Sequence, residues 1–457
     1  MVRLLARCSQ LAAALALGLS AGECWAFEDF DPRTGIPTES IANALPKHGD
    51  PSGIRKWLAE RGVFYNEIYT NDVLANVQGG IRRGTIDQGK LESILAVDLE
   101  KLAGLQGLSF FANTFLIHNT GRIRRDYVGG INTIAAIEAT PTARLSELWL
   151  EQKLLGGAAS VRIGQLVADA EFFFSNVSKM FLQSDWATIT AANLPSGGPA
   201  YPLSTPGVRL KIDPSKDVSL LLAAFNGDPA GAGAGGTDAE IRNRYGLNFR
   251  VNDPPLIMAE AQLRANQGNE DPGLARTLKF GVWGHLGEFN DQRFANDGKL
   301  LADPASSGVP AGRRGNWGVY GVIDQQLYRP MGGDALSGIS VFGRISVSPS
   351  DRNPIDFFVD GGIVFAGLIA SRPFDRFGAS FIYSRVSDSL RAFDRDQIAF
   401  SGVPGAVHDY EANLEMTYVA QVTSGWTVQP VVTRIWHPGA GESRNAMVMG
   451  VRSIWQY

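Results

Sequence analysis

Cysteine is scarce in this sequence, which has only Cys8 and Cys24 among its 457 residues. Both lie within the first 26 residues, a segment that we expect to be removed. The chain that follows residue 26 contains no cysteine. It therefore offers no disulfide bond, no thiol nucleophile and no cysteine ligand for a metal.

The first 26 residues have the order of features that is typical of a secretory signal peptide. Arg3 and Arg7 precede an apolar run over residues 11–19, and Cys24-Trp25-Ala26 follows. A basic start, a short apolar run and a small residue at the end mark a cleavable export signal. We expect cleavage after Ala26, with cleavage after Ala21 as the alternative.

Long hydrophobic runs and an excess of basic residues are also missing. No stretch approaches the roughly 18 apolar residues that a transmembrane helix needs. An exported chain of this kind that lies in a membrane must therefore be a closed β-barrel. The 42 basic and 46 acidic side chains form no basic patch or arm, so nucleic acid is not an expected partner.

The sequence does contain a regular alternation of apolar and polar side chains, from about residue 90 to the last residue, Tyr457. Over residues 410–422 the even positions are mostly apolar and the odd positions are mostly polar. Successive side chains of a strand point to opposite faces, so this period of two predicts strands with one apolar face and one polar face in contact with water. A soluble sandwich is the alternative, but the number of strands and the final outward aromatic residue favour a transmembrane barrel.

The alternation predicts an all-β fold, an antiparallel transmembrane barrel over residues 64–457, after an N-terminal periplasmic segment over residues 27–63. That segment contains a short helix after Gly53, which carries Ile54, Trp57 and Leu58 on one face. Seventeen strands are predicted: 65–83, 90–100, 107–118, 144–154, 159–166, 206–213, 217–226, 244–251, 256–265, 277–287, 315–325, 338–348, 355–365, 376–386, 409–422, 425–436 and 445–457. A barrel with both termini in the periplasm needs an even number, so one of these is an error and sixteen or eighteen strands are expected.

The same alternation predicts which polar side chains line the lumen. They carry both signs of charge, and this many charges on one side of the strands implies water there. The predicted lumen residues are Lys90, Glu92, Asp98, Glu100, Glu147, Trp149, Glu151, Lys153, Arg162, Arg209, Lys211, Asn248, Arg250, Glu260, Gln262, Arg264, Lys279, His285, Arg344, Asp356, Asp360, Glu411, Glu415 and Arg452. Long connections fall at about 119–143, 167–205, 288–313 and 387–408, and loops of such length often carry function.

Many blocks of this chain resemble the carbohydrate-selective porins of Gram-negative outer membranes, the OprB family. The resemblance extends over roughly residues 48–457 and rests on residues 76–84, 97–102, 144–152, 162–173, 192–202, 205–209, 225–229, 302–308, 350–353 and 437–439. It implies a sixteen-stranded barrel that conducts sugars passively, with an inward-folded loop, residues 167–205, as the candidate constriction. The positions that match the pore surface of the family are Arg82, Arg83, Asp98, Glu147, Trp149, Glu151, Arg162, Asp169 and Glu171.

These residue types suit a neutral sugar. Vicinal hydroxyls can hydrogen-bond in pairs to a guanidinium or a carboxylate, and the apolar face of a sugar ring can lie on an aromatic side chain. Glu147, Trp149 and Glu151 share one strand face, although generic filling of the lumen would explain each of them equally well. Arg82 and Arg83 are adjacent in a predicted strand, so only one of them can point inward.

Enzymatic chemistry has little support in the sequence. The five histidines are scattered without the spacing of metal ligands, and His118, beside Asn113 and Asn119, is a faint candidate for a lipase-type site. The glycine-rich stretch at residues 231–236 is not followed by an apolar helix, which favours a hairpin loop over a nucleotide site. We expect no enzyme, no cofactor and no metal.

The predicted function is passive and selective diffusion of small carbohydrates, such as glucose, across the outer membrane. A general diffusion porin and a structural or adhesive barrel are the alternatives. The expected partners are small neutral sugars, outer-membrane lipids and the outer-membrane assembly machinery, which would bind the C-terminal aromatic strand. The sequence leaves open whether the barrel is a monomer or a homotrimer.

Overall fold

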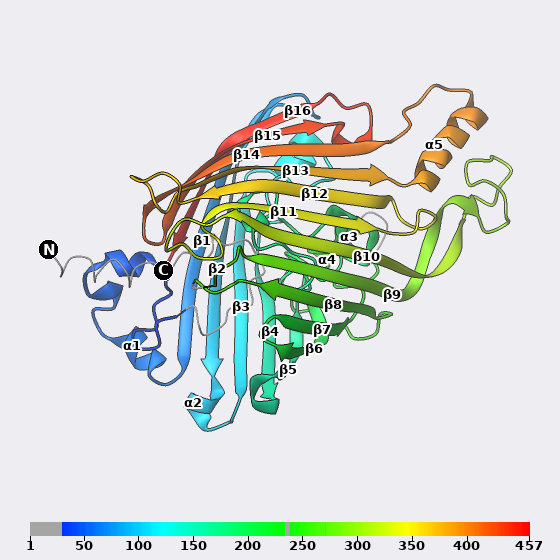
Figure 1. Cartoon of the computed structure of the whole chain (residues 1–457). Helices are drawn as coiled ribbons and strands as arrows, with labels where there is room; N and C mark the ends of the chain where they lie inside the picture. The colour runs from blue at the N-terminus through cyan, green and yellow to red at the C-terminus, as the bar shows by residue number, and fades with distance from the viewer. Residues whose placement is uncertain (1–29, 234–237, 270) are drawn as a thin grey trace.

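The strands close into a barrel around a partly filled lumen (Figure 1). The computed structural model describes residues 30–233, 238–269 and 271–457, so the predicted signal peptide, residues 1–26, lies outside the described residues. Each of sixteen antiparallel strands pairs with its neighbours in sequence, and β1 (Val63–Gln78) pairs with β16 (Ala446–Gln456). This last pairing leaves the sheet without a free edge.

The remaining strands follow in order around the barrel. They are β2 (Gly84–Asp98), β3 (Leu108–Asn119), β4 (Thr142–Leu154), β5 (Ala159–Leu166), β6 (Thr205–Ser215), β7 (Val218–Phe225), β8 (Leu256–Ala265), β9 (Arg276–Ala295), β10 (Pro310–Tyr328), β11 (Gly338–Val347), β12 (Ile355–Ala366), β13 (Arg376–Val386), β14 (Tyr410–Thr423) and β15 (Trp426–Trp436). Sixteen of the seventeen predicted strands correspond to these, which confirms the expected fold class.

The predicted strand at residues 244–251 is wrong. This segment lies in the loop between β7 and β8, after the short helix α4 (Ala239–Arg242). Its start runs beside β4, where Leu145 N–H donates to the carbonyl of Tyr245 at 3.0 Å. Gly246 has a φ of 68°, which breaks an extended strand. Asn248 and Arg250 consequently do not line a strand, and Arg250 forms an ion pair with Asp253 in the loop.

Short helices occupy the N-terminal segment, the turns and the loops. Besides α4, they are η2 (Ile41–Ala44), η3 (Pro46–Gly49), α1 (Ile54–Ala59), α2 (Leu99–Ala103), η4 (Ile123–Val128), η5 (Leu155–Gly157), η6 (Ser178–Met180), α3 (Thr188–Asn193), η7 (Pro195–Gly197), α5 (Asp388–Ser401) and η8 (Pro438–Ala440). Within the described ranges, no helix combines the length and the apolar character needed to cross a membrane.

Helix α1 follows Gly53, but it buries a different face from the predicted one. Ile54 and Trp57 are 59% and 52% exposed, whereas Arg55 and Ala59 are buried. Arg55 is covered because its guanidinium lies over the rings of Tyr65, at 4.1 Å, and of Tyr457, at 4.8 Å. The helix therefore attaches to the barrel through Arg55 and Ala59 and not through Ile54 and Trp57.

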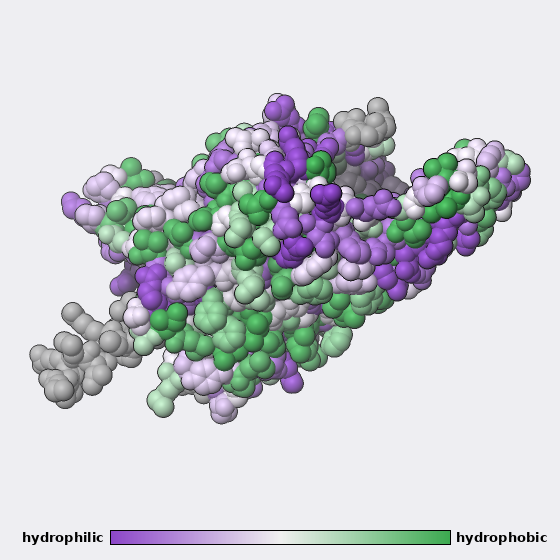
Figure 2. All heavy atoms as spheres, turned by 90° about the horizontal axis from the view of Figure 1, so that it is seen from above, coloured by the Kyte–Doolittle hydropathy of each residue, from purple (hydrophilic) through white to green (hydrophobic). Residues whose placement is uncertain are grey.

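Outward and inward faces of the strands separate as the alternation predicts. Leu95, Leu116 and Leu150 are exposed on the outer surface, whereas Lys90 and Arg162 are buried inside. Figure 2 shows hydrophobic side chains gathered on one side of the molecule and hydrophilic ones along a projecting arm. Two further predicted lumen residues, Asp98 and Glu100, lie elsewhere, because β2 ends earlier than expected. Asp98 caps the N-terminus of α2 by accepting from Glu100 N–H and Lys101 N–H, and Glu100 lies within that helix.

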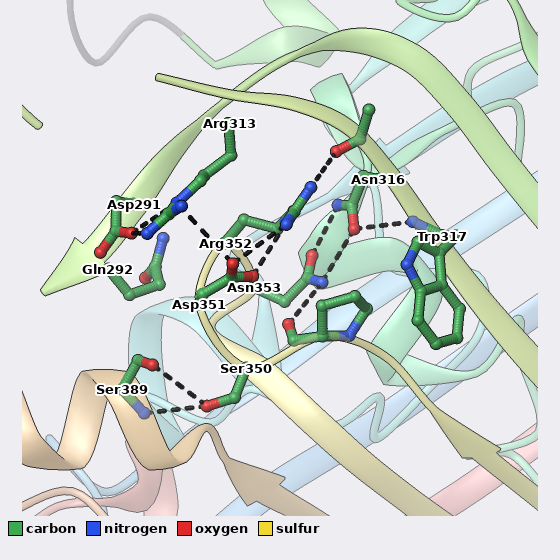
Figure 3. A network of polar contacts seen from close by, with 12 residues as sticks. Asp291, Gln292, Arg313, Asn316, Trp317, Ser350, Asp351, Arg352, Asn353 and Ser389 are labelled. Carbon is green, nitrogen blue, oxygen red and sulfur yellow. Dashed lines mark hydrogen bonds and ion pairs between the residues drawn. The ribbon is translucent and has the colours of Figure 1, made fainter. Parts of the chain in front are cut away.

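The projecting arm consists of the ends of β9 and β10 together with α5 (Figure 1). A network of polar contacts stiffens its base (Figure 3). Arg313 on β10 donates to Asp291 on β9 at 2.7 Å and lies 3.7 Å from Asp351, which also pairs with Arg352. Ser389 N–H at the start of α5 donates to the Ser350 hydroxyl at 2.9 Å. The network thus joins two strands, a loop and a helix at the end of the barrel that has the longer loops.

Candidate pore constriction

The loop between β5 and β6, residues 167–204, folds into the barrel and is called here the inward loop. Its side chains Phe172, Phe173 and Trp186 belong to one buried cluster with Trp283 and Tyr320 of the barrel wall. Phe173 stacks on Tyr320 with 4.2 Å between the ring centroids. This packing fixes the loop inside the lumen, against β9 and β10 of the wall.

Buried carboxylates of the wall hold the backbone of the inward loop. Glu260 accepts from Phe173 N–H at 2.9 Å, and Asp324 accepts from Asn176 N–H at 2.9 Å. Glu415 accepts from two consecutive amides, those of Leu182 and Gln183, at 2.8 Å each. Because these amides are buried away from water, each needs a hydrogen-bond acceptor from the protein.

Cations of the wall bind the carbonyl groups of the same loop. Arg344 pairs with Asp360 at 2.6 Å and donates to the carbonyls of Phe173, at 3.2 Å, and Asp185, at 3.0 Å. Lys279 Nζ donates to the Phe174 carbonyl at 2.9 Å. These predicted lumen residues therefore do point inward, but they face a protein loop and not open water.

A cluster of four charged side chains lies where the inward loop leaves the wall, and we call it the charge quartet. It comprises Glu151 on β4, Arg162 on β5, Arg209 on β6 and Glu171 in the inward loop. Glu151, Arg162 and Arg209 come together because they are direct neighbours in the strand register. Arg162 lies 2.6 Å from Glu151 and 3.5 Å from Glu171, and Arg209 lies 3.3 Å and 2.8 Å from the same two carboxylates.

The quartet has no net formal charge, and its guanidinium groups are more deeply buried than its carboxylates. The side chains of Arg162 and Arg209 are 4% and 2% exposed, while those of Glu151 and Glu171 are 15% and 13% exposed. Burial alone would raise the pKa of Glu171, but the charges of Arg162 and Arg209 outweigh it and hold this pKa below its ordinary value. Glu171 is therefore ionised at neutral pH.

Trp149 supports the quartet and does not offer an open ring face. Its ring stacks on Phe111 of β3 with a centroid distance of 4.7 Å and an interplanar angle of 12°. From the β5 side, the Arg162 guanidinium carbon lies 3.8 Å from the ring centroid. Gly164 leaves room for this arrangement, since a Cβ there would lie 2.8 Å from Trp149 Cβ. With 6% of Trp149 exposed, its ring is enclosed between Phe111 and the Arg162 guanidinium.

The structure brings together some of the predicted pore residues and separates others. Trp149, Glu151 and Glu171 each contact Arg162, and Glu147 lies two residues before Trp149 on β4. Asp169 begins the inward loop and accepts from Tyr201 N–H at 2.8 Å, and burial raises its pKa well above the ordinary value.

Arg82, Arg83 and Asp98 lie away from this group. Arg82 and Arg83 fall in the turn after β1, which ends at Gln78 and not at residue 83 as expected. Arg82 donates to the Asp126 carbonyl at 3.0 Å and lies over the Tyr127 ring. Asp98 is at the opposite end of the barrel, at the start of α2.

Arg209 is the quartet member that the sequence did not single out as a site residue. Alternation does place it in the lumen, and it ends one of the blocks on which the family resemblance rests. Its importance depends on the pairing of β5 with β6, which sets Arg209 directly opposite Arg162. That register follows a loop of 38 residues, so spacing along the chain cannot reveal it.

A closed barrel with an apolar outer surface, a loop folded into the lumen and charged side chains beside that loop defines a porin of the outer membrane. The family model for the carbohydrate-selective porin, OprB family, matches residues 82–457. The chain belongs to this family, whose members are channels and not enzymes. In the part of the chain that the structure describes, no three His, Cys, Asp or Glu side chains are grouped to hold a metal ion.

Individual relatives agree with this assignment. The chain is 25% identical to Porin B of Pseudomonas aeruginosa over 426 residues, which cover 88% of this chain and 89% of that protein. The high-pH structure of Pseudomonas putida OprB superposes with a TM-score of 0.80 at 21% identity, covering 90% of this chain and 98% of that one. The low-pH structure of the same protein gives a TM-score of 0.53 at 18% identity, covering 90% and 97%. These structures support the fold.

Proposed function

We propose that this porin lets neutral sugars of monosaccharide size diffuse passively across the outer membrane, with the charge quartet as the selective contact. The observation that supports the proposal is the pairing of two carboxylates with two guanidinium groups beside the inward loop. The partly exposed carboxylates of Glu151 and Glu171 present acceptors to the lumen, and the arginines hold them in place.

The chemistry of this contact suits a polyol. A sugar that enters a narrow lumen must replace the water on its hydroxyl groups, and fixed charged groups make strong hydrogen bonds to pairs of hydroxyls. Because the quartet is neutral overall, it has little attraction for ions of either sign. Binding must also be weak enough for release, as conduction requires.

The test is permeation into liposomes that contain the refolded chain without residues 1–26. Glucose, a disaccharide and an uncharged amino acid of similar size are compared, for the native sequence and for Arg162→Gln. We expect glucose to enter faster than the amino acid. We also expect Arg162→Gln to slow glucose entry roughly tenfold, since a hydrogen bond to a charged group contributes about 1.5–3 kcal/mol.

Lys153→Gln is the matched control, because Lys153 lies on β4 two residues beyond Glu151 and is exposed. It should permeate glucose as the native chain does. Equal rates for sugar and amino acid would indicate a general diffusion porin, and the absence of any flux would indicate a structural barrel. Either result would refute the proposal.

The division of the chain and its contacts with lipid and with the assembly machinery are proposals of the same kind. Residues 1–26 act as a signal peptide, residues 27–63 form a periplasmic segment, and residues 64–457 form the barrel. The outer surface contacts lipid, and the aromatic residues at the end of β16 present the chain to the assembly machinery. Trp455 supports this, because it stacks with Trp426 and Tyr69 in an outward aromatic group typical of a membrane interface.

A further inference from the structure

Four arginine residues meet at the short turn between β1 and β2, and we call them the arginine rim. They are Arg82, Arg83, Arg434 and Arg444. Residues 78–83 and 434–445 contain these four arginines and a single carboxylate, that of Glu442. Within the described part of the chain, none of the four forms a salt bridge. Their positive charge is therefore available to an anion from outside the protein.

Two of the arginines belong to the turn itself, and printed contacts of the barrel bring the other two to it. Gly80 N–H donates to the Arg444 carbonyl at 2.9 Å. Arg434 Nη1, on β15, donates to Gln78 Oε1 at 3.4 Å. The arginine rim thus forms only when the barrel closes, since closure pairs β1 with β16 and places β15 next to them (Figure 1).

A buried amide fixes the shape of the turn. Asn76 is 1% exposed, and its Nδ2 donates to the carbonyls of Gly79, at 2.9 Å, and Arg82, at 2.8 Å. Gly79 has a φ of 65°, and a Cβ there would lie 2.1 Å from the Asn445 carbonyl oxygen. Glycine is required at this close approach, and the backbone that carries the arginines is rigid before any ligand binds.

Aromatic side chains show the height of Arg434 in the membrane. β15 has eleven residues, from Trp426 to Trp436, and both tryptophans face outward. With a rise of about 3.3 Å per residue and a tilt of about 40°, they lie about 25 Å apart along the barrel axis, which is the height of an apolar band between two aromatic girdles. Arg434 is the outward residue next to Trp436, at the end opposite the chain termini. It therefore lies at the level of the lipid head groups of the outer leaflet.

Below the arginine rim, the outward face of four neighbouring strands is apolar. β14, β15, β16 and β1 lie side by side in the closed barrel. Their outward side chains that are more than 40% exposed include Val73, Val77, Met416, Met449 and Val451. A cationic rim above a continuous apolar surface matches an amphiphile that has an anionic head and acyl chains.

We propose that the arginine rim binds the phosphate groups of an outer-leaflet glycolipid, whose acyl chains lie on the apolar outward face of β1 and β14–β16. A guanidinium binds a phosphate through two parallel N–H···O bonds, and basic clusters at a membrane surface recognise anionic lipid head groups. A free phosphate ion would use the arginines but not the apolar face. The site goes beyond general contact with lipid, because it selects a head group by its charge.

The test measures lipid binding to the refolded barrel by native mass spectrometry. The two probes are lipid A, a phosphorylated glycolipid, and the same lipid after removal of its phosphates. The native barrel should bind lipid A more tightly than the dephosphorylated lipid. Combined Arg83→Gln and Arg434→Gln should weaken lipid A binding roughly tenfold, because two cationic contacts with the head group are lost.

Arg276→Gln is the matched control, because Arg276 is an exposed, outward arginine at the other end of the barrel, where β9 begins. It should bind lipid A as the native barrel does. Equal affinity for the two lipids would overturn the proposal, and so would an equal loss of affinity in the control and in the double variant. Displacement of lipid A by an equal concentration of inorganic phosphate would also overturn it, since the site would then recognise a free anion.

Photochemical crosslinking gives a second measurement that does not depend on a variant. Lipid A with a photoreactive group on an acyl chain should label peptides from residues 73–77 and 447–451 several-fold more than peptides from the outward face of β7–β9. Even labelling around the barrel would contradict a site on β1 and β14–β16.

Discussion

Single side chains in this barrel have tasks that their chemical type does not reveal. An aromatic residue beside charged groups suggested a platform for a sugar ring, and the structure shows Trp149 enclosed between Phe111 and Arg162. Arg344 is a predicted lumen residue, yet its hydrogen bonds go to Asp360 and to two carbonyls of the inward loop. Contact partners, and not residue type, therefore decide which charges meet the solute.

Trp149 can be tested as a positioning residue. Trp149→Leu should lower glucose permeation roughly fivefold, since the contact between a guanidinium and an aromatic face contributes about 1 kcal/mol. Trp149→Phe keeps an aromatic face and should lower it less. Permeation into liposomes measures both variants, and circular dichroism verifies that the barrel has formed. Native permeation by Trp149→Leu, beside reduced permeation by Arg162→Gln, would contradict this role.

The inward loop is the element that fills part of the lumen. Its attachment relies on backbone groups that are buried against the wall, and the partners of these groups lie far away along the chain, as with Glu415 and Leu182. A loop of this kind behaves as part of the wall for as long as its amides keep their acceptors.

Removal of one anchor should loosen the loop. Glu415→Ala leaves the amides of Leu182 and Gln183 without an acceptor, at a cost of about 1–3 kcal/mol for each. We expect a larger and noisier single-channel conductance and faster entry of a disaccharide. Glu415→Gln keeps one carbonyl oxygen at the same place and should have a smaller effect. If the alanine variant conducts as the native channel does, the loop does not depend on this anchor.

The N-terminal helix is a second element whose attachment can be measured. Arg55 donates to the carbonyls of Tyr457, at 3.1 Å, and Gly35, at 3.3 Å, and it is 1% exposed. Arg55→Ala should lower the stability of the folded barrel by about 2–4 kcal/mol, since it removes these bonds and two ring contacts. Thermal unfolding monitored by gel mobility measures the change.

Lys56→Ala is the control for that experiment, because its side chain is 63% exposed. It should unfold as the native chain does, and conductance should be unchanged in both variants. An Arg55→Ala barrel with native stability would mean that the segment before β1 is attached by other contacts.

The elements that could be predicted from the sequence are those with a local signal. A period of two extends through each strand, so sixteen strands and their inward rows were identified. Residues 244–251 have the same period, because Tyr245 and Leu247 alternate with polar residues. Both side chains are exposed on a loop, so the strand predicted there is wrong. The anchoring of the inward loop by Glu260 or Glu415 has no local signal, since it joins residues far apart in sequence.

At the scale of the whole molecule, closure of the barrel joins the two ends of the chain. The pairing of β1 with β16 brings Tyr69 opposite Trp455, and the last residue lies beside the N-terminal segment. The Tyr457 hydroxyl donates to the Gly49 carbonyl at 2.7 Å, and its ring lies against the Arg55 guanidinium. The terminal aromatic residue, expected to act in assembly, thus also has contacts that stabilise the finished barrel.

Refolding without the assembly machinery separates these two roles of Tyr457. Tyr457→Ala should lower the thermal stability of the barrel refolded in detergent, because it loses the bond to Gly49 and the contact with Arg55, together about 1–3 kcal/mol. Tyr457→Phe keeps the ring contact and should lose about 1 kcal/mol. A stabilising role predicts this order of melting temperatures in purified protein. If both variants melt as the native barrel does, and only the yield in cells falls, the residue serves assembly alone.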